Sequence, residues 1–523
     1  MAPGTGFRRS MSWLHGWAGV LLGGVLMAIF WTGSLSLFDR EIDRWMLPAT
    51  RLPAPPIELS LDHLLVEHAK QLAAASPLWS IRLPDARAPT LQLSYQLPGQ
   101  DRVTRHIDPH SGQLLADEGS WAGTGFIFPF HFSLHVPWLN IGYWLVGAAG
   151  MGMLVLLVSG VVAHRKLLAE FFTFRPRKRL QRGLLDLHNL TGVMVLPFHF
   201  LISLSGLAIF CLIYFPNIAD GLYAEDRAQL QLEALGGYTR PASGSAAPMA
   251  SLDAMLHSAE RIWSGADRPG NAYLIRIWNP GDRHAYVEVR RGFADEVTMN
   301  VDRLTFDANT GALLHQHWTT PIVGVQRFLT GLHFIQFDHW TLRWLYFAGG
   351  LSGCLLIGTG LLFWTGARRA RHARQGRISA RLVEATAVAG CTGLVIATLA
   401  FFIANRVLPV AAAAPGQRAA LEAWAFFLAW ALTLAHAVLR PAGSWREQLL
   451  TAAGMALLAV ALNWLTTGAH LGHSLRTGLH AVAGMDLMLL VLTGVCLISA
   501  KRIRLAQLKQ ATHQDDRVPQ CLS

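Results

Sequence analysis

The segment LLDLHNLTGVMVLPFHF (Leu184–Phe200) opens a long apolar run that nevertheless carries two histidines, His188 and His199. An ionisable side chain inside a membrane span is rare and usually marks a functional site. In a continuous α-helix these eleven residues would rise about 16.5 Å and turn through roughly 1100°, which places both imidazoles within about 20° of one face. Two haem groups stacked across a bilayer need this arrangement, because each iron takes an axial imidazole from a helix that faces the bundle interior.

The composition is that of a membrane protein. Of 523 residues, 52% are hydrophobic and only 15% are charged, against roughly 25% charged in soluble domains. The first apolar run, Trp13–Phe38, is too long for the apolar part of a signal peptide and is read as a retained span. We therefore expect an α-helical integral membrane protein with about eight transmembrane helices. The expected spans are residues 13–38, 140–164, 185–215, 341–366, 381–405, 420–440, 447–467 and 478–500.

The net charge of +11 comes from basic clusters at the ends of apolar runs, among them Arg8-Arg9, Arg175–Arg179 and Lys501–Arg504. This is the positive-inside pattern, which sets the orientation of a membrane protein, and it argues against a nucleic-acid partner. If the N-terminus lies in the cytoplasm, every strongly basic loop falls on the same side. Both termini are then expected to be cytoplasmic.

Two long polar segments, 39–134 and 216–330, fall on the outer side. Each contains a helical stretch that opens on Ser-Leu-Asp, and each carries a similar turn, DPHSGQLL at Asp108–Leu115 and DANTGALL at Asp307–Leu314. Such a turn indicates a strand, a left-handed glycine and a second strand. The match is an internal repeat, so we expect two copies of one small α+β module on the outer side.

These features predict the following organisation along the chain: a cytoplasmic tip with the first span (1–38), the first outer module (39–134), the second and third spans with a basic cytoplasmic loop (135–215), the second outer module (216–330), the fourth span (331–366), a basic cytoplasmic linker (367–380), a C-terminal four-helix membrane unit (381–500) and a cytoplasmic tail (501–523).

Six histidines near the first four spans are candidate cofactor ligands. Their expected positions across the membrane differ. His15, His164 and His188 lie near the inner side, His135 and His333 lie near the outer side, and His199 lies between these two levels. The inner iron would be bound by His188 with one of the other two inner histidines. The outer iron would be bound by His135 and His333, unless His199 serves it. His131 precedes His135 by four residues, but prolines on either side make helical spacing there doubtful.

At these residues the sequence resembles the PepSY-associated transmembrane-helix family, which includes iron-regulated inner-membrane proteins and ferric-siderophore reductases. The clearest match is Ser159–Leu207, with further matches at Ser12–Leu35, His131–Gly147 and Gly331–Trp364. The two outer modules are similar to PepSY domains. The resemblance covers roughly residues 8–370, so the last four spans are not explained by it.

The resemblance implies a protein of the bacterial inner membrane that holds two b-type haems and passes electrons to a periplasmic acceptor, a ferric siderophore above all, with release of Fe(II). All six candidate histidines fall in the family's histidine-bearing motifs, which do not fix the four iron ligands. We expect the haem irons to be bound through His135, His188, His199 and His333. No catalytic acid–base residue is expected. No nucleotide-binding motif follows a strand, so a separate flavoprotein or a quinol would supply the electrons.

Two alternatives remain at this point. The chain could be a membrane-anchored PepSY protein that binds or senses a partner, or a transporter without redox activity. Asp486, in the last span, is the acidic residue that argues for a transporter. The five cysteines form no C-x-x-C or C-x-x-C-H motif, so neither a disulfide framework, a zinc ribbon nor covalently attached haem is expected.

Overall fold

The chain forms two compact units in a computed structural model. The structure describes residues 5–164, 180–215, 227–375, 378–410 and 416–515, so the basic cluster Arg175–Arg179 lies outside the described residues. The first unit consists of residues 1–46, 119–203 and 344–523. The second consists of residues 47–118 and 204–343.

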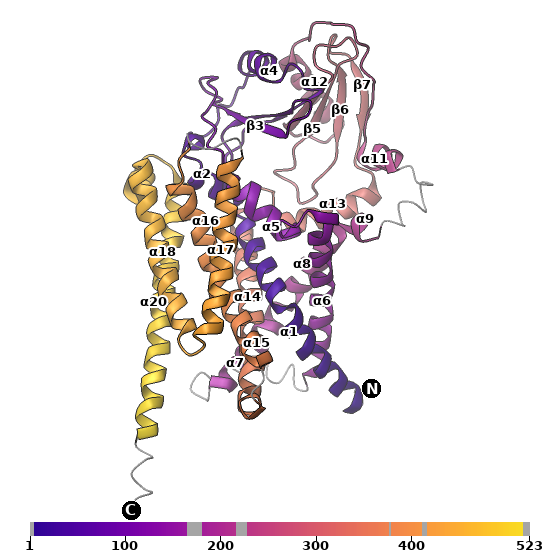
Figure 1. Cartoon of the computed structure of the whole chain (residues 1–523). Helices are drawn as coiled ribbons and strands as arrows, with labels where there is room; N and C mark the ends of the chain where they lie inside the picture. The colour runs from indigo at the N-terminus through magenta and orange to yellow at the C-terminus, as the bar shows by residue number, and fades with distance from the viewer. Residues whose placement is uncertain (1–4, 165–179, 216–226, 376–377, 411–415, 516–523) are drawn as a thin grey trace, which may run out of the picture. The chain divides into compact units, whose positions relative to one another are not determined.

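The membrane helices belong mainly to the first unit, in which long helices run side by side (Figure 1). Among the described residues, seven helical segments are long and apolar enough to cross a membrane. They are α1 (Thr5–Ser36), α6 (Ile141–Ala163) with the short η3 (Trp138–Asn140) before it, α14 (Trp340–Gln375), α15 (Ile378–Val388) continued through the π-helical η4 (Ala389–Gly393) into α16 (Leu394–Val407), α17 (Gln417–Leu439), α18 (Ser444–Thr467) and α20 (His480–Asp515). The chain is thus an integral, multi-pass membrane protein, as expected.

The third expected span is broken. It consists of α7 (Leu180–Met194) and α8 (Leu196–Ile209), which are bent by 64° relative to each other. Pro197 lies at the second position of α8, where it lacks an N–H to bond to the preceding turn and its ring disfavours a straight continuation. The expectation that His188 and His199 share one straight stripe is therefore wrong, because they lie on opposite sides of this bend. Counting the bent pair as one span gives eight.

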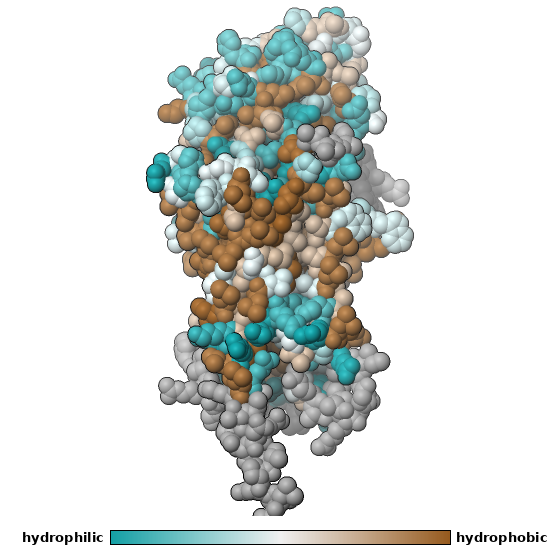
Figure 2. Space-filling view, turned by 60° about the vertical axis from the view of Figure 1, so that its left-hand side comes forward, coloured by the Kyte–Doolittle hydropathy of each residue, from teal (hydrophilic) through white to brown (hydrophobic). Residues whose placement is uncertain are grey.

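Apolar side chains cover much of the surface that faces the viewer in Figure 2. The helices contribute exposed residues such as Leu432, Leu457 and Val491, which are 67%, 47% and 50% exposed. In a water-soluble protein such a surface would be a liability. On spans of this length, it is the surface that contacts lipid.

Short elements join the ends of the spans within the first unit. They are α2 (Asp39–Met46), the π-helical η2 (Gly123–Ile127), α5 (Phe128–Ser133) and α19 (Leu471–Arg476). The C-terminal helices hold α2 and the segment just before η2 through buried carboxylates. Asp486 accepts a hydrogen bond from Trp45 Nε1 at 2.8 Å, and Glu422 accepts from Ser120 Oγ at 2.5 Å and Asn405 Nδ2 at 2.9 Å. Asp486 therefore has a structural role that needs no transport function.

The second unit is built on one antiparallel sheet of seven strands, in the order β3-β2-β1-β4-β5-β6-β7. Residues 39–134 supply β1 (Leu78–Arg82), β2 (Leu91–Gln96) and β3 (Arg102–Ile107). Residues 216–330 supply β4 (Ala272–Trp278), β5 (Tyr286–Arg291), β6 (Arg303–Asp307) and β7 (Leu313–His317). The two sequence repeats thus meet where β1 pairs with β4, with Ser80 opposite Arg276.

The two repeats of the second unit also share a core and a reciprocal pair of helix caps. Helices α3 (Leu61–Leu64), α4 (Val66–Ala73) and α12 (Leu252–Gly265) pack on the sheet through buried side chains such as Leu65 and Trp263. Asp253 accepts a hydrogen bond from Leu61 N at 2.7 Å, and Asp62 accepts one from Leu252 N at 2.9 Å. Each repeat therefore caps the first turn of the other repeat's helix.

The remaining helices of the second unit are η1 (Pro48–Thr50), α9 (Cys211–Tyr214), α11 (Arg227–Leu235) and α13 (Pro321–Phe334). A buried ionic cluster braces the end of the sheet before α13. Asp302 accepts hydrogen bonds from Thr319 Oγ1 at 2.6 Å and Arg291 Nε at 3.1 Å. Burial alone would raise the pKa of Asp302, but these bonds and the charges of Arg291 and Arg268 outweigh it and hold that pKa below its usual range.

Candidate functional site

The first candidate site is a pair of imidazoles in the first unit. His15 comes from α1 and His188 from α7, and their ring centroids are 6.1 Å apart with the ring planes 77° to each other. The two residues are separated by 173 positions along the chain, so only the folding of the helices brings them together. Of the two inner pairings left open by the sequence, the structure brings together His15 and His188.

Both rings are oriented by the neighbouring helix in the same way. His15 Nδ1 donates to the carbonyl of Leu156 at 3.0 Å, and His188 Nδ1 donates to the carbonyl of Leu356 at 2.9 Å. Each Nδ1 therefore carries the proton and each Nε2 carries the lone pair. No residue in the described part of the chain forms a hydrogen bond with either Nε2 atom.

A glycine makes room for each ring. A Cβ added at Gly160 would lie 3.0 Å from His15 Cε1, and one added at Gly360 would lie 2.9 Å from His188 Cε1. Each glycine lies four residues after the leucine whose carbonyl accepts the hydrogen bond from the ring, Leu156 for Gly160 and Leu356 for Gly360. Carbonyl and glycine are thus stacked on one helix face, and together they fix the position of the ring.

The same setting recurs at two further histidines. His131 on α5 donates from Nδ1 to the carbonyl of Ile29 at 2.9 Å and lies against Gly33, four residues later. In the second unit, Nδ1 of His333 on α13 lies 3.1 Å from Ser205 Oγ, and the ring lies against Gly206. Burial lowers the pKa of His131, which keeps the imidazole neutral and able to act as a ligand.

His199 is completely buried and has a different arrangement. Its Nε2 lies 3.3 Å from the carbonyl of Gly349 and 3.2 Å from Ser352 Oγ. Its Nδ1 is also buried and has no hydrogen-bond partner among the residues that the structure describes. An unpartnered polar atom in a buried site is costly, and a bound ligand would remove that cost.

The other two candidates make contacts of their own. His164 ends α6, where its Nε2 lies 3.1 Å from Asn189 Nδ2. His135 follows α5, and its Nε2 donates to the carbonyl of Phe126 at 2.8 Å. Its ring is stacked between those of Trp121 and Phe126, with both interplanar angles at 11°. In the described part of the first unit, neither His164 nor His135 is paired with a second imidazole as His15 is with His188.

His131 was missed in the sequence because its neighbours suggested no helix. The structure explains the difficulty, since α5 ends at Ser133 and His135 has a positive φ of 51°. A helical spacing between the two histidines was therefore rightly doubted. The signal that identifies His131 lies elsewhere in the chain, in the glycine of the first span that receives its ring, and a sequence alone does not show which span faces which.

The donor set suits a haem iron. Neutral imidazoles from facing helices are the usual axial ligands of b-type haem. Two metal–nitrogen bonds of about 2 Å, with each ring centre about 1 Å beyond its nitrogen, separate the centroids by roughly 6 Å, close to the 6.1 Å between His15 and His188. No group of three or more His, Cys, Asp or Glu residues in the described ranges is arranged to hold a bare metal ion.

Comparisons with known proteins agree with this description of the membrane helices. Residues 12–367 match the family model described as the PepSY-associated TM region. The chain is also similar to the uncharacterized protein PA4219 of Pseudomonas aeruginosa, with 30% identity over 383 residues, which cover 68% of this chain and 88% of that protein.

Proposed function

Because the chain belongs to the PepSY-associated transmembrane family, we propose that it is a haem-dependent oxidoreductase of the bacterial inner membrane that passes electrons to a periplasmic acceptor. The acceptor we propose is a ferric siderophore. The observation that supports haem binding is the pair His15 and His188, whose ring centroids are 6.1 Å apart and whose Nδ1 atoms are both bonded to backbone carbonyls. In this proposal both termini are cytoplasmic and the second unit is a pair of PepSY-like modules on the periplasmic side.

A bound b-type haem supplies a one-electron ferric–ferrous couple whose potential depends on its ligands and its burial. The chain's own residues determine these properties. His15 and His188 would bind iron through Nε2, while the carbonyls of Leu156 and Leu356 keep each ring in one tautomer and make the ligand more basic. Apolar helices around the pair exclude water, which limits side reactions of the reduced site.

A second haem is part of the proposal. A similar or unsatisfied setting is found at His131 and His199 in the first unit and, separately, at His333 in the second unit. His135 is left out of the proposed ligand set, because its ring is stacked between Trp121 and Phe126 and not against a described glycine. His164 is left out because it is not the histidine that faces His188.

Reduction of the siderophore would follow from iron chemistry. Fe(III) is held by hard oxygen donors, and its reduction to Fe(II) weakens that hold. The electron comes from a donor outside the chain, for which we propose a quinol or a separate flavoprotein. The second unit would present the docking surface for the acceptor.

The test is a reduced-minus-oxidised visible spectrum of the purified protein, with haem quantified per chain. Two low-spin b haems per chain are expected. His15→Ala and His188→Ala should each lose one haem, whereas the matched control His164→Ala should keep both. Absence of haem from protein made with an adequate haem supply would refute the proposal and would favour a membrane-anchored binding protein.

A further inference from the structure

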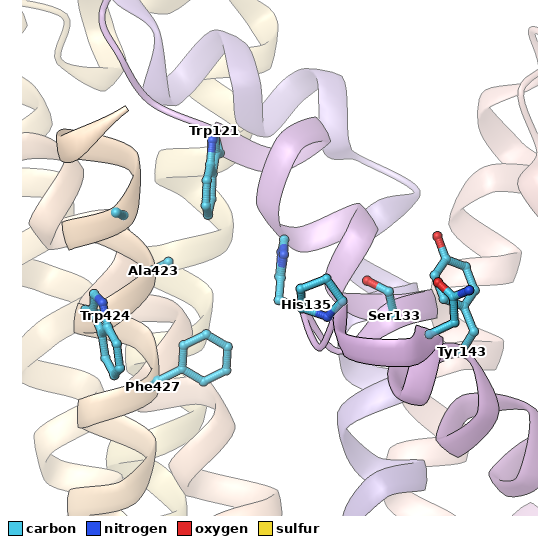
Figure 3. Close-up of a pocket in the computed structure, with 10 residues that line it drawn as sticks. Trp121, Ser133, His135, Tyr143, Ala423, Trp424 and Phe427 are labelled. Atoms are coloured by element: carbon cyan, nitrogen blue, oxygen red, sulfur yellow. The ribbon is translucent and has the colours of Figure 1, made fainter. Parts of the chain in front are cut away.

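A pocket of about 640 Å³ lies in the first unit beside the stacked ring of His135. Its lining residues come from the segments around η2, α5 and α6 and from α17: Trp121, Ser133, His135, Pro137, Asn140, Tyr143, Ala420, Ala423, Trp424 and Phe427. In Figure 3, Trp424 and Phe427 lie on one side, and Trp121 and His135 lie across the pocket from them. This size suits a small organic molecule.

The lining favours an uncharged aromatic ligand. None of the ten lining residues is acidic, lysine or arginine, so an anionic ligand such as a carboxylate or phosphate would find no counter-charge. Trp121, Trp424 and Phe427 offer ring faces against which a flat ligand can stack. Ser133, Asn140 and Tyr143 add hydroxyl and amide groups.

His135 supplies one defined hydrogen-bond acceptor. Its Nε2 donates to the carbonyl of Phe126 at 2.8 Å, so its Nδ1 carries the lone pair. No residue in the described ranges forms a hydrogen bond with this Nδ1. A ligand that donates a hydroxyl hydrogen is therefore matched to it, whereas a ligand that presents only a carbonyl oxygen would set one lone pair against another.

The pocket lies where a ligand dissolved in lipid would enter. Tyr143 is in the first turn of α6, and Ala423 and Trp424 are in the second turn of α17, so the pocket lies at one end of two spans. Nearby Trp138 is 69% exposed and Trp424 is 61% exposed. Exposed tryptophans at the ends of spans are typical of the membrane–water interface.

From these observations we propose that the pocket binds the hydroxyl-bearing ring of a membrane quinol, with His135 Nδ1 as the acceptor for one quinol hydroxyl. Binding itself needs no haem, and the inference rests on the proposed function only in identifying the bound quinol as the electron donor. Oxidation of one quinol to quinone would release two protons and two electrons, one electron for each of two Fe(III) ions. The pocket is expected to prefer quinol to quinone, because the quinone carbonyl has no hydrogen to donate to Nδ1.

The binding test uses the full chain in lipid nanodiscs. The fluorescent quinol analogue 2-heptyl-4-hydroxyquinoline N-oxide is titrated, and decylubiquinol or decylubiquinone is added as a competitor without oxygen. Quinol should compete at least about tenfold more strongly than quinone, the factor expected from one hydrogen bond. Absence of analogue binding, or equal competition by the two forms, would overturn the inference.

Variants locate the site. His135→Phe keeps a flat ring between its neighbours but removes the acceptor, and should weaken analogue binding about tenfold. The matched control His480→Phe, at an exposed histidine that does not line the pocket, should leave binding unchanged. Trp424→Ala tests the opposite wall at a mostly exposed position and should also weaken binding. Unchanged binding in both His135→Phe and Trp424→Ala would place the ligand elsewhere and overturn the inference.

Haem content measured on the same samples separates the two proposals. His135→Phe should keep its haem, because His135 is not among the proposed iron ligands. Haem-loaded protein that does not bind the analogue would overturn the quinol site and leave the proposed function standing. Protein without haem that still binds the analogue through His135 would support the site and refute the proposed function.

Discussion

Gly360→Ala is the substitution that examines the imidazole pair most directly. An alanine Cβ there would lie 2.9 Å from His188 Cε1 and 3.2 Å from Nδ1, whereas ordinary contact begins at 3.4 Å. The ring would have to retreat by roughly half an ångström, which takes the 2.9 Å bond to the Leu356 carbonyl to about 3.4 Å, beyond the usual range. Loss of such an outer-shell partner typically weakens metal binding 10–100-fold, so we expect haem affinity to fall about tenfold.

The assay is the rate of haem transfer from the purified protein to excess apomyoglobin. Gly454→Ala on α18 is the control, because nothing lies within 4 Å of its added Cβ. Glycine-to-alanine changes inside helices normally stabilise by about 1 kcal/mol, so a faster haem loss in Gly360→Ala alone is specific to the ring. Gly160→Ala should reproduce the effect through His15. Equal transfer rates for Gly360→Ala and Gly454→Ala would refute the reasoning.

Three further predictions concern stability. Asp253→Ala removes the acceptor for Leu61 N and should cost about 1–2 kcal/mol, seen as faster amide exchange in α3 than in the native chain. The pKa of Asp302 is lower in the folded protein than its unfolded value of 3.8, so this carboxylate stabilises the second unit above pH 3.8. That stability is lost as the pH falls through the lower folded pKa, and Asp302→Asn should therefore flatten the fall in Tm below about pH 4. Trp45→Phe removes a donor from buried Asp486 and should cost about 1–3 kcal/mol, and unchanged amide exchange in α2 would contradict this.

The membrane spans were largely predictable from the sequence, because their length and apolarity are set by the thickness of the bilayer. Seven expected spans correspond to single candidate segments. The bend between α7 and α8 was not predicted, although Pro197 was visible in the opening stretch. A proline in an apolar run marks a possible kink, but its size depends on the helices packed against it.

The site was predictable in kind but not in its pairing. Histidines in apolar runs indicated a cofactor, and the depth argument reduced the partners of His188 to two. The choice of His15 depends on which helix faces which, and on the glycine–carbonyl stack that receives each ring. These are contacts across more than a hundred residues of sequence, which local patterns do not encode. The joining of β1 to β4 escaped prediction for the same reason.

The pairing of β1 with β4 has a consequence for how the protein is made. Ser80 and its partner Arg276 are 196 residues apart, and the candidate membrane segments at residues 138–163 and 181–209 lie between them. During synthesis, the edge of β1 that pairs with β4 stays unpaired until both segments and β4 have emerged. Such long-range strand pairing is slow, and an exposed edge strand invites wrong partners. The interval before β4 arrives is therefore when the nascent chain depends most on a chaperone.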